Sequence, residues 1–258
     1  MKTIDLQKIQ HNVKQGDVCG DLLPNIKESC LLVEDKKVVG FFISKIPEKM
    51  QKLAAIADKE LNSDRVPKSM MARSDVLKDR QQGVQQYSAL LGSIPPKPHM
   101  RRHHANYAAV HSEKTAQLFI RAMLGLAKES EALIKQYMPE QYNYLHEQCS
   151  KNIDKKWLFS NIFTSSISNY NIAANFHTDK ANFKGSLNAI ICKRKGATGG
   201  NLCVPDYDAI FDQCDNSMLV YPAWKNMHGV TPINTYANGG YRNTLVFYLI
   251  NYFMSTKR

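Results

Sequence analysis

Apolar and polar positions follow two different rhythms along the first part of the chain. Residues 31–46 (LLVEDKKVVGFFISKI) contain two apolar runs separated by the charged turn at residues 34–37, a pattern that predicts two short strands. Pro47 comes next, and because proline is favoured in the first turn of a helix, we expect a helix to begin there. The apolar face of this helix, at helical spacing, would consist of Met50, Leu53, Ala54, Ala57 and Leu61.

A second repeat of helical period lies between Ser112 and Tyr137. Its apolar positions are Leu118, Ala122, Leu126 and Leu133. Serine is a favoured N-cap residue, so Ser112 is expected to cap the helix, and Pro139 is expected to end it.

Beyond Trp157 the pattern changes to short β-rich runs separated by turn sequences such as GATGG, PDYD, YPAW and NGG. No internal repeat or linker interrupts the chain. We therefore expect one compact α+β domain over residues 1–258. In it, a mixed helical and short-strand half (residues 1–156) packs around a β-sandwich or barrel (residues 157–258).

Charge changes this picture by indicating a partner. The 258 residues include 34 Lys and Arg against 23 Asp and Glu, a formal net charge of +11. Such an excess favours a polyanionic partner, above all nucleic acid, over an acidic protein surface.

The cysteines and the apolar runs indicate the compartment. No two of the six cysteines form a C-x-x-C pair, so neither a zinc ribbon nor a disulfide framework is predicted. The N-terminus has no apolar signal core, and the longest apolar runs are too short to span a bilayer. We expect a soluble intracellular protein with reduced thiols, no membrane partner and a monomeric state.

The stretch NYNIAANFHTDKANFKGS, residues 169–186, holds the first candidate chemistry. Its alternating apolar row predicts a strand, and side chains two apart on a strand point to the same face. His177 and Asp179 would therefore project together, as two potential metal ligands.

A third ligand and a further cation follow in the β-rich half. His228 lies in KNMHGVTPI and Arg242 in YRNTLVFYLI, where Arg242, Thr244, Val246 and Tyr248 would share one strand face. Two histidines and one carboxylate form the facial triad that holds Fe(II) and leaves positions open for a 2-oxo acid and O2. An arginine nearby can clamp the distal carboxylate of that acid with two hydrogen bonds.

Other interpretations of this pattern remain open. An isolated H-x-D sequence is common by chance and then purely structural, and zinc is an alternative to iron. The H-E-x-x-H motif and the H-x-E motif with a downstream P-C-x-x-C are missing, which disfavours the familiar zinc hydrolases and deaminases. Iron is therefore the preferred metal.

Several motifs together resemble one enzyme family. HTDKAN followed by GS, then TGGNLCVPDY, MHGVTPI and RNTLVFYL, is similar to the TET/JBP family of Fe(II)- and 2-oxoglutarate-dependent dioxygenases. These enzymes oxidise the 5-methyl group of pyrimidines in DNA. The resemblance covers the β-rich C-terminal part and implies a double-stranded β-helix core (jelly-roll or cupin-like). The compact length is more similar to phage or other microbial members than to animal enzymes.

The resemblance also implies roles for individual residues. His177, Asp179 and His228 would be the iron ligands, Arg242 would clamp the carboxylate of 2-oxoglutarate, and Thr244 would contact the same co-substrate. With Fe(II), 2-oxoglutarate and O2, the site would convert a methyl group into a hydroxymethyl group.

Three further positions would contact the flipped base. Asn182 matches an asparagine that hydrogen-bonds the base, and Tyr248 matches an aromatic residue that stacks on it. Ile250 stands where animal members have a base-contacting histidine, so the choice between 5-methylcytosine and thymine stays open. Without the triad, Asn182 would be interpreted as a turn residue and Tyr248 as a core aromatic.

A basic stretch upstream, KPHMRRHHANYAAVH, is expected to contact DNA phosphates, chiefly through Arg101 and Arg102. Its histidines make a second metal site the alternative. Arg73 is a further candidate contact to the co-substrate or to DNA.

Two other functions remain as alternatives to DNA oxidation. A dioxygenase of the same kind could hydroxylate a protein side chain or a small molecule. A non-catalytic barrel could bind DNA and never consume 2-oxoglutarate.

Overall fold

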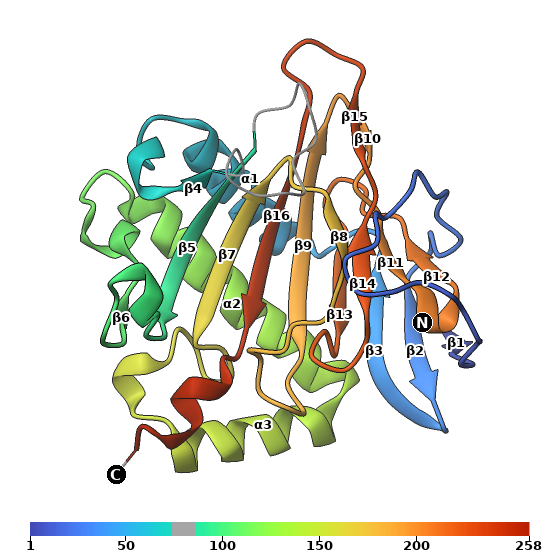
Figure 1. The fold of residues 1–258 in the computed structure, drawn as a ribbon, viewed down its shortest axis with the longest axis horizontal. Coiled ribbons are helices and arrows are strands. Elements are labelled where there is room, and N and C mark those ends of the chain that lie inside the picture. Colours follow the sequence, from blue (N-terminus) through green and yellow to red (C-terminus); the bar gives the residue numbers. More distant parts are fainter. Residues whose placement is uncertain (74–85, 258) are drawn as a thin grey trace.

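The computed structural model describes residues 1–73 and 86–257 of the chain. Two β-sheets and three α-helices form its framework (Figure 1). The helices are α1 (Glu48–Asn62), α2 (Gln117–Tyr137) and α3 (Pro139–Asn152). None of the helices within the described part of the chain is long and apolar enough to cross a membrane.

The larger sheet has ten strands, antiparallel except for the pair β1 and β2. Their order is β1 (Lys2–Asp5), β2 (Cys30–Glu34), β3 (Lys37–Ile43), β13 (Met218–Tyr221), β9 (Asn188–Lys195), β16 (Tyr241–Tyr248), β7 (Ser165–Tyr170), β5 (Tyr87–Ile94) and β4 (Ala72–Arg73), with β6 (Asn106–Tyr107) paired to β5. This sheet takes strands from both sides of residue 156. The division into halves at that point stays a prediction.

The smaller sheet has four strands, in the order β12 (Ala209–Phe211), β11 (Leu202–Val204), β14 (His228–Val230) and β8 (Ala174–His177). A separate two-stranded ribbon joins β10 (Ala197–Gly199) to β15 (Ile233–Thr235). Helices α1 and α2 cover one face of the large sheet, and the four-stranded sheet lies on its other side (Figure 1). The mixed α and β composition expected from the sequence is confirmed.

The predicted hairpin and first helix are also confirmed. Strands β2 and β3 pair antiparallel, and α1 begins directly after Pro47. Met50, Ala54, Ala57 and Leu61 are buried against the large sheet and α2, as the apolar period predicted.

The predicted start of the second helix is wrong, whereas its predicted end at Tyr137 is confirmed. Ser112 does not cap it, because its hydroxyl donates a hydrogen bond to the carbonyl of Ala109 (2.8 Å) and closes a 3-10 turn, and α2 begins at Gln117. Pro139 does not simply end that helix but opens α3, which the sequence reasoning missed. Proline is accepted there because the first helical N–H needs no partner within the helix.

The single strand expected across residues 169–179 is two strands in different sheets. After β7, Asn171 adopts a left-handed conformation (φ +53°), which asparagine tolerates better than most residues. Its side-chain oxygen accepts a hydrogen bond from the backbone N–H of Arg242 (2.8 Å), and its own N–H donates to the carbonyl of Arg242 (2.7 Å). The chain then crosses from the large sheet into β8 of the small one.

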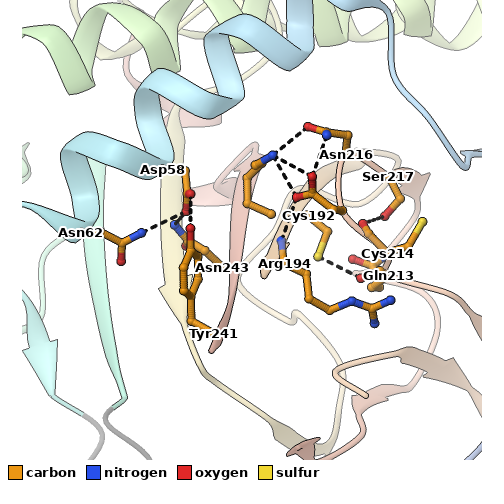
Figure 2. A network of polar contacts seen from close by, with 12 residues as sticks. Asp58, Asn62, Cys192, Arg194, Gln213, Cys214, Asn216, Ser217, Tyr241 and Asn243 are labelled. Atoms are coloured by element: carbon orange, nitrogen blue, oxygen red, sulfur yellow. Dashed lines mark hydrogen bonds and ion pairs between the residues drawn. The ribbon is translucent and has the colours of Figure 1, made fainter. Parts of the chain in front are cut away.

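A buried carboxylate fastens helix α1 to strand β16, as Figure 2 shows. Asp58 is only 7% exposed, and it accepts hydrogen bonds from the hydroxyl of Tyr241 and from the amides of Asn243 (3.1 Å) and Asn62 (3.2 Å). Burial raises the pKa of Asp58 above its usual value, although the hydrogen bonds from Tyr241 and Asn243 oppose this. Because side chains alternate along a strand, Arg242, Thr244, Val246 and Tyr248 of β16 face the other sheet.

Candidate metal and co-substrate site

A cavity of about 490 Å³ lies between the two sheets. The large sheet contributes Asn169, Ile190 and Thr244 to its lining, and the small sheet contributes His177, Leu202 and His228. Arg242, Val246 and Tyr248 also line it, so the four residues predicted to share one face of the last strand do so. Polar groups therefore converge from both sheets on one largely apolar space.

Two histidines and one carboxylate meet in the lining of this cavity. His177 ends β8 and His228 begins β14, and the two are direct partners across the antiparallel pair. Oδ1 of Asp179 lies 3.6 Å from Nε2 of His177 and 3.9 Å from Nε2 of His228. The ligand atoms of all three residues lie within 4.8 Å of one another, close enough to hold one metal ion.

Hydrogen bonds fix both imidazoles with the same ring nitrogen facing Asp179. Nδ1 of His177 lies 2.7 Å from the carbonyl oxygen of Asn175, and Nδ1 of His228 lies 3.0 Å from that of Asn226. A carbonyl can only accept, so Nδ1 carries a proton in each ring, and in the neutral ring Nε2 presents a lone pair. This is the tautomer in which Nε2 can bind a metal.

The two histidines differ in exposure. The His177 side chain is 40% exposed, whereas that of His228 is 6% exposed. Burial, together with the neighbouring His177, lowers the pKa of His228 to about 4. His228 is therefore neutral at physiological pH, as metal binding demands.

A buried amide behind the triad was missed by the sequence reasoning. Nδ2 of Asn188, at the start of β9, donates to Oδ2 of Asp179 (2.8 Å), and Oδ1 of Asn188 accepts from Nδ2 of Asn182 (2.8 Å). Both asparagines are buried, Asn182 at 6% and Asn188 at 4% exposed. No motif marks Asn188, because its contact with Asp179 arises only when two separate sheets come together.

Arg242 is a buried cation in the lining of the cavity. It is 2% exposed, the Nε of its guanidinium has no hydrogen-bond partner, and the two terminal nitrogens lie 3.5 Å from the oxygens of Ile172 and Gln213. Among residues 1–73 and 86–257, no carboxylate forms an ion pair with it. A buried guanidinium with unused donors calls for an anion, and a carboxylate of 2-oxoglutarate fits that demand.

Neighbouring residues shape the space around this cation. Gly200, in the TGGN sequence, has a φ of +66°, and a Cβ at that position would lie 2.4 Å from Cδ of Arg242. A side chain at position 200 would collide with the side chain of Arg242, so glycine is needed there. Thr244, two residues after Arg242 and 3% exposed, adds a hydroxyl to the same cavity wall.

The three predicted base-contacting residues are only partly brought together. Asn182 and Tyr248 line the cavity. Ile250 forms a β-bridge with Asn182, but it is buried in the hydrophobic core and is not part of the cavity lining. The predicted contact of Ile250 with the base therefore has no support in the cavity geometry.

The basic stretch upstream forms a short surface loop. Lys97 and Arg102 pair across it, Arg101 is exposed in a left-handed conformation, and Nε of Arg102 donates to the carbonyl of Pro95 (2.7 Å). Of the described residues, only His177, Asp179 and His228 form a group able to hold a metal, which leaves the alternative of a histidine site in this loop without support. The side chain of Arg73 lies outside the described residues.

Comparisons with known proteins extend these observations. No protein-family model matches the chain, and no curated protein matches its sequence. Among solved structures, NgTET1 in complex with 5mC DNA is similar with a TM-score of 0.64 and 14% identity, over 95% of this chain and 87% of that one.

Two other structures match less well. An oxidoreductase of the 2OG-Fe(II) oxygenase family from Burkholderia pseudomallei has a TM-score of 0.48 and 13% identity, over 85% of this chain and 87% of that one. OsALKBH1 has a TM-score of 0.44 and 13% identity, over 81% and 97% of the two chains. The TET-like fold implied by the sequence motifs is thus confirmed by the similarity to NgTET1, and on this fold the chain carries two histidines and a carboxylate in one cavity with a buried arginine.

Proposed function

We propose that this protein is an Fe(II)- and 2-oxoglutarate-dependent dioxygenase that oxidises the 5-methyl group of a flipped pyrimidine in DNA, with 5-methylcytosine preferred over thymine. The observation that carries the proposal is the combination of two elements in one cavity. The ligand atoms of His177, Asp179 and His228 lie within 4.8 Å of one another, and the buried Arg242 forms no ion pair within the described part of the chain. We interpret the two facing sheets as the double-stranded β-helix of such enzymes.

The residues present fit the metal and the co-substrate. Nε2 of each histidine and Oδ1 of Asp179 would hold Fe(II) and leave further positions open. Arg242 and Thr244 would bind and orient the distal carboxylate of 2-oxoglutarate. When bound together, Fe(II), 2-oxoglutarate and O2 would supply the chemistry that oxidises an unreactive C–H bond.

The rest of the cavity would hold the base and exclude water. Ile167, Ile190 and Val246 give it apolar walls next to the triad, which suits a methyl group. Tyr248 offers a ring face to an unstacked base, a contact worth about 1–3 kcal/mol. A base inside a duplex could not reach the triad, so the nucleotide must flip out of the stack.

The hydrogen-bond network favours cytosine. The Asp179 carboxylate can only accept, so Asn188 donates to it and must accept from Asn182. The NH2 group of Asn182 donates to Asn188 and also lies 3.4 Å from Oδ2 of Asp179, so the amide oxygen of Asn182 remains as an acceptor. Cytosine carries an amino donor at position 4, where thymine carries an oxygen, so an acceptor here supports 5-methylcytosine as the substrate.

DNA as the partner is supported by charge and by the fold comparison. The chain carries a net charge of +11, and the exposed Arg101 belongs to a basic surface loop that can contact phosphates. NgTET1, which shares the fold, was solved with 5mC DNA. A monomeric state stays a prediction.

The direct test is the release of succinate from 2-oxoglutarate by the purified protein, measured with and without methylated duplex DNA. We expect release that needs Fe(II) and rises strongly with DNA, together with hydroxymethylated nucleosides detected by mass spectrometry. Release without any effect of DNA would instead indicate a protein or small-molecule substrate. DNA binding without succinate would indicate a non-catalytic barrel.

A further inference from the structure

We propose that Asn188 is a positioning residue of the metal site, which holds the Asp179 carboxylate so that a single oxygen faces the metal. The inference rests on the metal-binding part of the proposed function but not on the identity of the substrate. It assigns a role to a residue that neither the motifs nor the spacing of the ligands marks.

Asp179 needs such support because of where it lies. It follows the end of β8, in a loop whose backbone is held by the hydrogen bond from the N–H of Asp179 to the carbonyl of Ala223 (3.1 Å). Its side chain is 30% exposed, so solvent competes for its two oxygens. A carboxylate in this setting can rotate unless another group fixes it.

Asn188 is placed to provide that fixation. It is the first residue of β9, a strand between β13 and β16 in the large sheet, and its backbone is in register with Tyr221 of β13. It is only 4% exposed, and its Nδ2 donates to Oδ2 of Asp179 over 2.8 Å. A buried amide on an inner strand therefore anchors a carboxylate on a loop.

The hydrogen bond also distinguishes the two carboxylate oxygens. Oδ2 is occupied by Asn188, with Nδ2 of Asn182 at 3.4 Å as a second donor. Oδ1 is the oxygen directed at Nε2 of both histidines. The metal should then be bound through one carboxylate oxygen, with the other held away from it.

The oxygen of the Asn188 amide completes the arrangement by accepting from Asn182 at 2.8 Å. Asn188 thus bridges the residue proposed to read the base and the residue proposed to hold the metal. The conformations of the two side chains are linked through one amide, which must keep its orientation to satisfy both.

The test compares metal binding with stability in Asn188→Leu, a substitution close in size that removes both hydrogen bonds. We would titrate the metal-free protein with Fe(II) under anaerobic conditions, and with Co(II) to record its absorption spectrum. Loss of a group that orients a ligand typically weakens metal binding about 10–100-fold, and we expect a loss of that size with an altered Co(II) spectrum.

Asn243→Leu is the matched control. Asn243 is also a fully buried amide, on the neighbouring strand β16, but it donates to Asp58 on the helix side of the sheet. Its replacement should lower the melting temperature and leave metal affinity and the Co(II) spectrum unchanged. This separates loss of stability from loss of ligand orientation.

Metal affinity in folded Asn188→Leu equal to that of the wild type would overturn the inference. If that variant does not fold, Asn188→Ala is measured in the same way, with the same expected loss and the same contradicting result. A wild-type protein that binds no Fe(II) would overturn both this inference and the proposed function. A protein that binds Fe(II) through Asn188-dependent ligation but oxidises no DNA would contradict the proposed substrate alone.

Discussion

His177 and His228 lie opposite each other on neighbouring antiparallel strands, with their ring centroids 4.3 Å apart. Far apart in the sequence, they become neighbours only through the pairing of β8 with β14. A slip of one residue in this register would turn one imidazole to the other face of the sheet. The candidate metal site is therefore a property of the four-stranded sheet as much as of the H-x-D motif.

Replacing His177 by Ala, or Asp179 by Ala, should abolish Fe(II)-dependent succinate release while leaving DNA affinity largely intact. In the proposed function the triad would supply the metal ligands, whereas basic surface residues would supply most DNA binding. His146→Ala, at an exposed position on α3, is the control and should behave as the wild type. Full turnover in either triad variant would contradict the metal assignment.

Arg242→Lys should raise the KM for 2-oxoglutarate at least tenfold, the equivalent of about 1.4 kcal/mol, because an ammonium cannot reproduce a planar two-point clamp. Fe(II) affinity should not change. Arg194→Lys is a suitable control, since Arg194 is the register partner of Arg242 on β9 and already bonds to Gly199 and Asp212. An unchanged KM in Arg242→Lys would show that another residue anchors the co-substrate.

Replacing Arg101 and Arg102 together by Ala should weaken binding to DNA of any sequence and flatten its dependence on salt. Phosphate contacts release counterions and carry no base information, so the salt slope reports how many are lost. The control replaces Lys49 and Lys52 by Ala. These are two exposed cations of α1, which covers the face of the large sheet opposite the four-stranded sheet (Figure 1). Affinities unchanged across several salt concentrations would place the DNA elsewhere.

Asp58→Asn should change how stability depends on pH. The pKa of Asp58 is raised in the folded protein, so between about 3.9 and that raised value the folded state binds a proton that the unfolded state does not. The free energy of unfolding of the wild type should therefore fall, relative to the variant, as pH rises through this window. The loss is about 1.4 kcal/mol for each unit by which the pKa is raised.

Urea unfolding of both metal-free proteins between pH 4 and pH 8 measures this difference. A constant difference in unfolding free energy across that range would show that Asp58 titrates normally. The contact between α1 and β16 should survive in the variant, because the hydroxyl of Tyr241 can still donate a hydrogen bond to the side-chain oxygen of the new asparagine.

The parts of the fold that the sequence predicted are those governed by local pattern. The hairpin of β2 and β3, helix α1 after Pro47, and the shared face of Arg242, Thr244, Val246 and Tyr248 all follow from period or turn chemistry. The failures occurred where local pattern does not decide. The hydroxyl of Ser112 bonds within a 3-10 turn rather than capping the helix. The apolar row around Asn171 continues although the chain crosses there from one sheet to the other.

The candidate site shows the same division. The positions of His177, Asp179, His228 and Arg242 could be inferred from motifs because their chemistry is rare in combination. Asn188 could not, because its role depends on a contact between β9 and the loop after β8. The contact of Ile250 with the base was implied by the resemblance alone and stays a prediction; its side chain packs into the core.

In the proposed function, this cavity oxidises the methyl group of 5-methylcytosine, and the amide oxygen of Asn182 reads the base. The decisive measurement is the initial rate of oxidation on duplex oligonucleotides that differ in one central base: 5-methylcytosine, thymine or cytosine. We predict the highest rate on 5-methylcytosine, and a loss of this preference in Asn182→Ala, since an unmet hydrogen bond at a buried edge costs about 1–3 kcal/mol. Equal rates on 5-methylcytosine and thymine, or activity on thymine alone, would contradict it.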